Sequence, residues 1–412
     1  MGNHQGRLIA ALSAQFRDID LAEDVLQDAL AAALISWPKK GVPHDPKGWL
    51  YQTAKRKAID RYRRRTTRRE KSGALAYQTH LNIMTDDDII NGEIDINGEI
   101  DAEQNLPDER LGLIFACCHP ALPTLAHTAL TLKTVCGLST PQIAAAFLVS
   151  ETTMAQRIVR AKNKIKKAGI PFVVPDTVLW TERWKSVLGV VYLIFNAGYS
   201  SLDQDKDVDL CTEAIRLGRI LVKLLPGEAE AAGLLALMLL THARRPARLA
   251  SPDIYISLEE QNRNLWDKGK ISEGQNLLLK TLTKGRPDVY QIQAAISAVH
   301  CQAASFIDTD WQEITVLYER LYAYEPTPIV LLNASVALSF AQGPAAGLAS
   351  LELVTQGGNL DKYQPYHAAR ADMLRRDGQY SKAKKSYGTA IALSGSKVEQ
   401  EYLAVKMASM KL

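Results

Sequence analysis

The amino-acid sequence predicts an all-α fold: two small helical domains, the second with a helix-turn-helix, joined by an acidic linker and followed by a larger domain of helical hairpins. Apolar residues recur at intervals of three and four, without convincing strand-like alternation. The net charge is +7 over residues 1–71, −9 over 72–110, +6 over 111–170 and zero over 171–412. We therefore expect domains at 1–71, 107–170 and 171–412, with the linker at 72–106.

The first domain is expected to contain three helices. One covers roughly residues 5–16. The next begins near Asp20, an N-cap candidate, and ends before Pro38. The third begins at Pro46, because proline suits the first turn of a helix, and continues past Arg65.

The linker is expected to be a mobile tether. Residues 72–106 are rich in acids and poor in apolar residues, and the hexapeptide INGEID occurs twice, at 90–95 and 96–101. Acidic, weakly hydrophobic segments with Asn-Gly pairs rarely form a packed core.

The second basic domain is expected to contain a helix-turn-helix. Pro107 and Pro123 each begin a helix, and a third ends near Phe147. Ser150 caps a basic helix that ends at Gly169. Two helices joined by a short turn, the second of them basic, are typical of this DNA-binding motif.

The remaining 240 or so residues are expected to form paired amphipathic helices. Near the end, a 34-residue pattern has the spacing of a tetratricopeptide repeat. Its members are Ala371, Gly378, Tyr380, Ala383, Tyr387 and Ala390.

Two basic helices are candidates for nucleic-acid binding. Residues 55–71 hold ten basic and two acidic residues, a balance that suits phosphate binding beside aromatic rings. In the helix after Ser150, we expect Met154, Ile158, Ala161 and Ile165 to form a buried stripe. Polar side chains then point outward, as in a helix that reads the major groove. Four lysines, Lys162, Lys164, Lys166 and Lys167, suit backbone phosphates.

The order of these segments resembles a bacterial sigma factor of the extracytoplasmic-function type over residues 1–170. The resemblance rests on DLAEDVLQDALAAAL, KRKAIDRYRRR and LSTPQIAAAFLVSETTMAQRIVRAKNKIKKAGIPF. The tail resembles a subgroup with a fused, tetratricopeptide-like helical domain. The matching segments are residues 116–120, 193–199, 258–267 and 366–372.

This resemblance implies binding sites for bacterial RNA polymerase core and for promoter DNA. Asp24, Gln27 and Asp28 would contact the coiled coil of the polymerase clamp. The −10 element would be bound by Trp49, Lys55, Arg56, Asp60, Arg61, Tyr62, Arg63 and Arg64. The −35 element would be bound by Thr152, Thr153, Gln156, Arg157, Arg160 and Lys164. The protein would direct promoter-specific initiation, and its tail would modulate that activity in cis and bind an unidentified protein or small ligand.

Catalytic and cofactor motifs are not expected. Phosphate-binding glycine loops, HExxH and GxSxG are missing from the sequence. Cys117, Cys118, His119, His127 and Cys136 fit no standard zinc spacing, so we expect no metal site and interpret the thiols as structural. The alternation DQDKDVD at 203–209 lacks the glycine and closing glutamate of a calcium loop. We therefore expect a protein that is not an enzyme and needs no cofactor.

Two other functions remain open at this point. A helix-turn-helix activator with a helical sensor would bind duplex DNA without polymerase, but it would not need the acidic docking helix. An enzyme with its active site in the tail would need a catalytic constellation that we do not find. With no export signal, no membrane-spanning stretch and five cysteines expected to be reduced, the sequence predicts a cytoplasmic protein.

Overall fold

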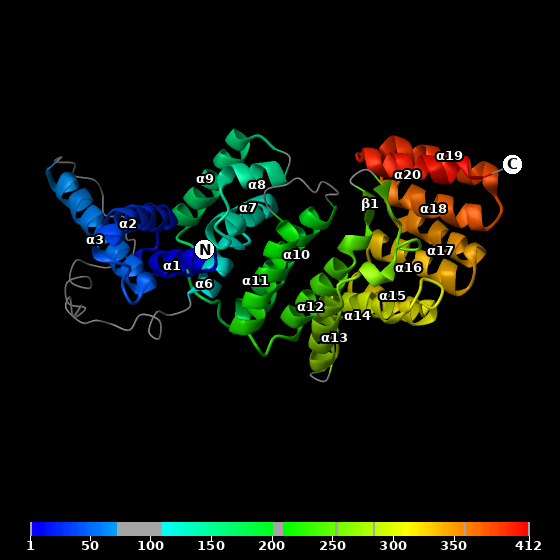
Figure 1. The fold of residues 1–412 in the computed structure, drawn as a ribbon, viewed down its shortest axis with the longest axis horizontal. Coiled ribbons are helices and arrows are strands. Elements are labelled where there is room, and N and C mark those ends of the chain that lie inside the picture. The colour runs from blue at the N-terminus through cyan, green and yellow to red at the C-terminus, as the bar shows by residue number, and fades with distance from the viewer. Residues whose placement is uncertain are drawn as a thin grey trace. The chain divides into compact units, whose positions relative to one another are not determined.

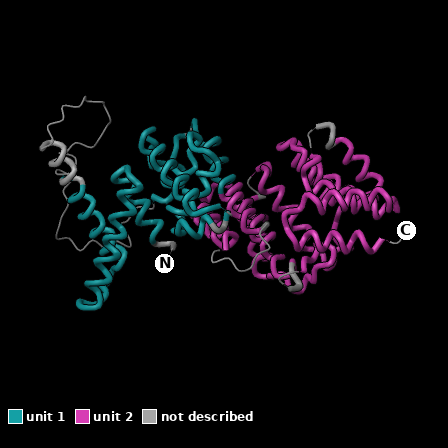
Figure 2. The backbone as a smooth tube through the Cα atoms, turned by 90° about the horizontal axis from the view of Figure 1, so that it is seen from above, with its two compact units in different colours: residues 1–190 teal, residues 191–412 magenta. Residues whose placement is uncertain are grey.

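The computed structural model describes residues 2–71, 109–147, 149–200, 209–251, 254–282, 285–357 and 360–410. These residues form helices joined by short turns, apart from one small hairpin of two strands (Figure 1). This confirms the predicted all-α class. The chain divides into two compact units, residues 1–190 and 191–412 (Figure 2). The predicted linker at 72–106 lies outside the described residues.

Three helices begin the first unit: α1 (Gly2–Phe16), α2 (Ile19–Lys40) and α3 (Pro46–Lys71). The N-cap of α2 is Asp18, whose side chain accepts a hydrogen bond from the Leu21 N–H, so the expectation that Asp20 is the cap was wrong. The start of α3 was predicted correctly, and Asp45 Oδ1 accepts from the N–H groups of Lys47 and Gly48.

The end of α2 also differs from the prediction. The helix continues through Pro38 and ends at Lys40, where Gly41 has a φ of 84°. The N–H of Gly41 donates to the Trp37 carbonyl and closes the final turn. Pro38 has no N–H to donate to the Leu34 carbonyl, so this last turn lacks one backbone hydrogen bond.

Four helices follow: α6 (Arg110–Cys117), α7 (Thr124–Thr134), α8 (Thr140–Ala146) and α9 (Glu151–Ala168). Ser150 caps α9 by accepting from the Thr153 N–H, and Gly169 ends it in the left-handed conformation with φ 61°. The predicted stripe of Met154, Ile158, Ala161 and Ile165 is buried. Helix α10 (Thr177–Ser200) begins in the first unit and continues without a break into the second.

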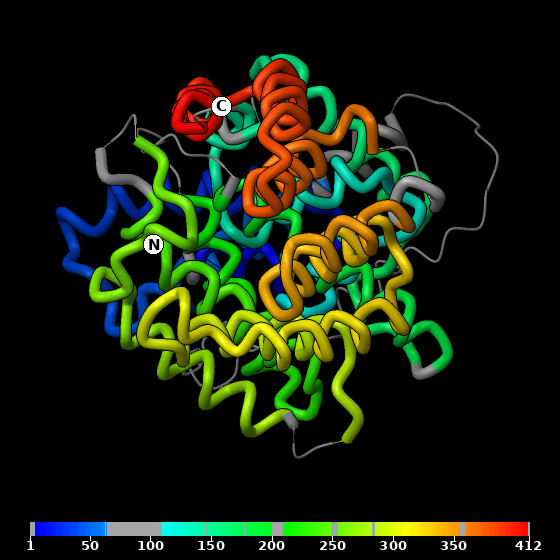
Figure 3. Tube along the Cα trace, turned by 90° about the vertical axis from the view of Figure 1, so that its right-hand side faces the viewer, coloured from blue at the N-terminus to red at the C-terminus, as the bar shows by residue number. Residues whose placement is uncertain are grey.

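The second unit is a series of helices in which each packs on the next in chain order (Figure 3). Separate apolar clusters lie between successive helices, because each helix buries only the faces it shares with its neighbours. The elements are α11 (Leu210–Leu224), α12 (Ala229–Ala243), η1 (Arg245–Ala247), β1 (Leu249–Ser251), β2 (Ile254–Tyr255), η2 (Arg263–Leu265), α13 (Lys268–Leu282), α14 (Val289–Gln302), α15 (Trp311–Tyr324), α16 (Pro328–Ala341), α17 (Pro344–Gly357), α18 (Gln364–Arg376), α19 (Tyr380–Leu393) and α20 (Lys397–Ala408).

The residues of the 34-residue pattern lie in the hairpin formed by α18 and α19. Ala371, Ala383 and Ala390 are completely buried, and Tyr387 is nearly so. Gly378 has a φ of 77° in the turn, a conformation that glycine adopts without strain. The small residues therefore allow close approach of the two helices.

The antiparallel pair of β1 and β2 was not anticipated. Strands of three and two residues are too short to show alternation in the sequence. Among the described residues, no helix is long and apolar enough to span a membrane.

Candidate nucleic-acid interface

An acidic face of α2 carries the residues expected to contact polymerase. Gln27 is exposed, and Asp24 and Asp28 lie beside α3. The Arg61 guanidinium donates to Asp24 Oδ2 at 2.9 Å and to Asp28 Oδ2 at 2.6 Å. Arg61 was expected to contact the −10 element, and here it joins the basic helix to the acidic one.

The basic helix α3 packs on α2 through its small apolar residues. Ala54 and Ala58 are fully buried, and the indole of Trp49 makes an edge-on contact with Trp37, with ring centroids 5.5 Å apart. Partial burial lowers the pKa of Lys55. Of the other residues expected to bind the −10 element, Arg56, Asp60 and Arg63 are exposed. The side chains of Tyr62 and Arg64 are not among those that the structure describes.

The expected −35 residues lie on one side of α9, away from its buried stripe. Met154 and Ile158 fix the helix against α7 and α8. Five of the six, Thr152, Thr153, Gln156, Arg160 and Lys164, are exposed, and Arg157 is half-buried. With its capped amino terminus and outward polar row, α9 has the geometry of a helix that can enter a major groove.

The sequence did not predict that two lysines on α9 form ion pairs with α2. Lys162 is only 9% exposed and pairs with Asp20 Oδ1 and Glu23 Oε2 of α2, both at 2.9 Å. Lys166 pairs with Asp18 Oδ2 at 2.7 Å. Burial lowers the pKa of Lys162, but the Glu23 and Asp20 carboxylates outweigh burial and leave the pKa raised.

The cysteine and histidine cluster has internal partners. The Cys117 and Cys118 thiols lie 3.3 Å and 3.8 Å from the hydroxyl groups of Thr134 and Thr131. Burial raises the pKa of Cys118 to about 12, and it raises the pKa of Cys117 further. Each of these buried thiols therefore lies beside a threonine hydroxyl in the interior of its own domain.

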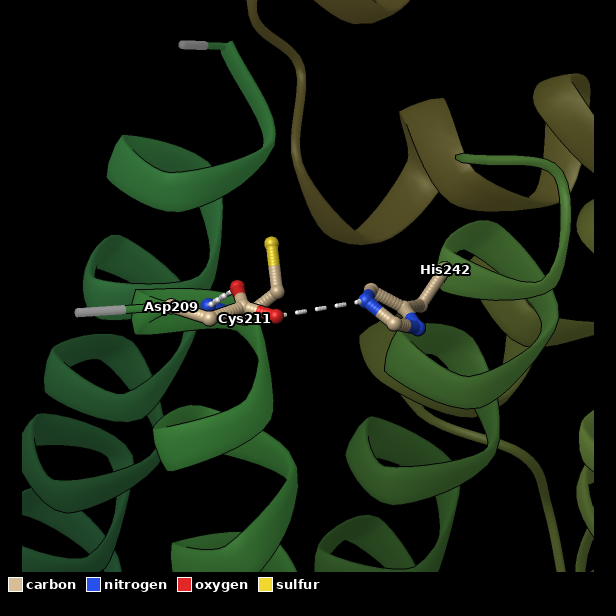
Figure 4. Close-up of side chains that lie close together, drawn as sticks. All are labelled: Asp209, Cys211 and His242. Carbon is tan, nitrogen blue, oxygen red and sulfur yellow. Dashed lines mark hydrogen bonds and ion pairs between the residues drawn. The ribbon is translucent and has the colours of Figure 1, made fainter. Parts of the chain in front are cut away.

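A second group of possible metal ligands lies in the second unit (Figure 4). The ligand atoms of Asp209, Cys211 and His242 lie within 4.8 Å of one another. However, Arg245 pairs with Asp209 Oδ2 at 2.8 Å, and burial raises the pKa of Cys211 to about 12. Asp209 also caps α11 by accepting from the Cys211 N–H. The residues present therefore fit an arginine ion pair and a helix cap better than a divalent cation.

The first half of α10 is anchored on α6. Arg183 is buried, and its guanidinium donates to the Phe115 carbonyl at 2.6 Å. Ser186 donates to the Cys118 carbonyl at 3.0 Å. Trp180 and Trp184 stack on each other with centroids 5.6 Å apart, and both contact Phe115. These contacts complete the apolar core around α6.

Comparison with known proteins finds matches to three family models along the chain. Residues 1–68 match Sigma-70 region 2, and residues 113–165 match Sigma-70, region 4. Residues 183–282 match a family of unknown function (DUF6596). An uncharacterized protein of Rhizobium meliloti (strain 1021) is 41% identical over 402 residues, 97% of this chain and 92% of that protein. No solved structure matches the chain significantly.

Sigma-70 regions 2 and 4 on one chain support the class of RNA polymerase sigma factors, which bind DNA and act in transcription initiation. Members of this class are not enzymes, and their partners are RNA polymerase core and promoter DNA. At this level of identity and coverage, the chain belongs to the same family as the Rhizobium meliloti protein.

Proposed function

We propose that the protein is a sigma factor of the extracytoplasmic-function type that directs core polymerase to a particular set of promoters. The observation that carries this proposal is the outward row on α9, which presents Gln156 and Arg160 beside a Ser150-capped helix start. Glutamine and arginine side chains at this position match the hydrogen-bonding edges of bases in the major groove. Region 4 would thereby read the −35 element.

Region 2 would dock on polymerase and open the −10 element. The docking face is Asp24, Gln27 and Asp28 on α2. The opening helix is α3, where exposed Arg56 and Arg63 would hold phosphates while Trp49 is near enough to the surface to stack on a base. Arg61 would keep the two helices in register through its ion pairs with α2.

The carboxy-terminal domain would modulate this activity in cis. The support for this role is helix α10. Its first half is anchored on region 4 by Arg183 and Trp184, and the same helix continues into the second unit. We propose that the domain packs on the sigma regions, holds them in a productive arrangement and binds an unidentified protein or small ligand through its tetratricopeptide-like hairpins.

Transcription in vitro from a library of randomised promoters, with bacterial core polymerase and the full chain, tests the proposal. We expect transcripts whose templates share two short motifs, and replacement of Arg160 by alanine should relax the choice at one position of the upstream motif. DNA binding without any polymerase-dependent transcript would favour an activator instead.

The role of the tail is tested by a chain that ends at Ser200 and so keeps the whole of α10. We expect it to transcribe less than the full chain at every polymerase concentration. Equal transcription would leave the tail as an independent binding domain.

A further inference from the structure

Arg244, in the second unit, carries a charge that the described residues leave unpaired. It directly follows α12, and its side chain is half-buried. Its Nε atom is buried and has no hydrogen-bond partner in the described part of the chain, and no carboxylate there pairs with the guanidinium. Removing a charge from water without a counter-charge costs free energy, so the feature indicates a ligand or ion that compensates for it.

A neighbouring arginine, Arg263 in η2, shows how a structural guanidinium is held nearby. It donates to the carbonyls of His300 and Ala303, at 2.6 and 2.7 Å, and to Thr309 Oγ1 at 3.1 Å. Its Cζ also lies over the indole of Trp266, 4.8 Å from the ring centroid. All of these partners are uncharged. Arg263 is therefore well bonded, yet its positive charge is not neutralised.

The charges of the two arginines act on each other and on the same imidazole. Burial lowers the pKa of Arg263, and the charge of Arg244 lowers it further. Burial, followed by the same two charges, lowers the pKa of His300 to about 3. The carboxylate of Asp308 acts on Arg263 in the opposite sense, but it is exposed and accepts from Ser305 Oγ at 2.6 Å. The surroundings of Arg244 therefore favour an anion and repel a cation.

Two buried ring nitrogens in the same group also lack partners. Trp266 and His300 are only 3% and 9% exposed, and neither Trp266 Nε1 nor His300 Nδ1 has a hydrogen-bond partner among the described residues. An indole N–H can only donate, and a neutral imidazole can carry its proton on either nitrogen. We call Arg244, Arg263, Trp266 and His300 the arginine cluster. It offers positive charge and donors, and it lacks an acceptor.

We propose that the arginine cluster binds the oxyanion of a small organic ligand, a carboxylate or a phosphate, with Arg244 as its main contact. The planar fork of a guanidinium donates two parallel hydrogen bonds to either group. The anion would supply the counter-charge for Arg244 and acceptors for the two ring nitrogens. The inference rests on the proposed function, because it specifies the small ligand through which the tail would modulate initiation.

Tyrosines beside the cluster indicate the rest of the ligand. Burial raises the pKa of Tyr318 to about 12, Tyr192 contributes to the rise and the charge of Arg244 opposes it, so Tyr318 lies within electrostatic reach of both. Tyr192 contacts Tyr290 edge-on, with ring centroids 5.5 Å apart. Burial raises the pKa of each of these two tyrosines, and the Glu325 carboxylate raises both further. We therefore expect a single anionic group joined to an uncharged, ring-sized body that packs on the tyrosines.

Substitutions in the full chain separate ligand binding from a structural role. In a buffer without oxyanions, Arg244→Met removes an uncompensated charge and should raise the melting temperature by about 2–4 °C. A structural arginine would give the opposite sign, because its loss would leave bonded partners unpaired. Arg320→Met is the matched control, because Arg320 is exposed on α15, and it should leave the melting temperature unchanged.

Binding is measured by calorimetric titration with benzoate, phenyl phosphate and inorganic phosphate at fixed ionic strength. We expect one of the two aromatic anions to bind more tightly than inorganic phosphate, which identifies the preferred anionic group. Arg244→Met should weaken that binding about tenfold or more, since it removes charge-assisted hydrogen bonds. Arg244→Lys keeps the charge without the fork and should lose part of the affinity. Arg320→Met should bind as the unaltered chain does, and benzyl alcohol, a ring without the charge, should not bind.

The outcomes separate this site from the proposed function. Equal binding by Arg244→Met and the unaltered chain, or binding of none of the anions by the unaltered chain, would overturn the proposal. A lower melting temperature of Arg244→Met without oxyanions would overturn it too. These measurements use neither DNA nor polymerase, so such failures leave the sigma assignment intact. Conversely, an unaltered chain that supports no transcription would refute the proposed function, while binding that depends on Arg244 would still support the site.

Discussion

Helices α3 and α9 are both strongly basic, yet their cations have different partners. Arg61 of α3 pairs with α2 inside its own region, and its side chain remains 36% exposed. Lys162 of α9 pairs with α2 of the other region and is almost fully buried. Basic composition therefore identifies helices suited to polyanions, but it does not reveal which of their cations are already neutralised by the protein.

The largest effect is expected at the acidic face that Arg61 holds. Replacing Asp24 and Asp28 by lysine should lower the affinity for core polymerase at least a hundredfold, because the docking face would reverse its charge. Folding should change by no more than about 1 kcal/mol, since these pairs are largely exposed. Copurification with core polymerase and thermal unfolding measure the two effects. Normal copurification of the folded variant would refute the docking assignment.

The contrast between the buried and the exposed ion pairs is tested by replacing Lys162 and Arg61, one at a time, by methionine. Lys162→Met should reduce stability by roughly 1–3 kcal/mol, because Glu23 is left without its counter-charge at a buried site. Arg61→Met should cost about 1 kcal/mol or less. Urea unfolding of both variants provides the measurement. Equal losses would mean that burial does not distinguish the two ion pairs.

The exposed row of α9 is expected to divide into base readers and phosphate binders. Arg160→Ala should cost about 1–3 kcal/mol and relax preference at one base position. Lys164→Ala should weaken binding to all sequences and reduce the salt dependence of binding. Titrations of promoter variants at several salt concentrations measure both. Indistinguishable behaviour of the two variants would place the reading face elsewhere on the helix.

The smallest effect is expected from alkaline pH. The pKa of Lys162 is raised in the folded protein, so its ion pairs contribute fully below the ordinary lysine pKa of about 10.4. That contribution should be lost as the pH rises through the higher folded value. The free energy of unfolding should therefore remain constant from neutral pH to about pH 10 and fall above it. The Lys162→Met variant should not show this step.

Local signals in the sequence predicted the elements well where a side chain caps its own helix. Ser150 and Asp45 lie next to the turns that they stabilise, so their roles can be read from adjacent residues. The end of α2 at Lys40 was missed because proline usually stops a helix, whereas here the helix continues through Pro38 and Gly41 ends it. The identities of Lys162 and Glu23 could not predict their pairing, because 139 positions separate them in the chain.

The anchoring of α10 constrains how such a protein can have been assembled in evolution. Phe172, Trp184 and Val187 are buried in the first unit, and Phe115 is covered by the indoles of α10. A domain appended to a finished neighbour would leave that neighbour's apolar core complete. Here the segment that leads to the tail supplies part of the apolar core of the first unit. Recombination between relatives would therefore preserve that core only if the crossover falls after Val187.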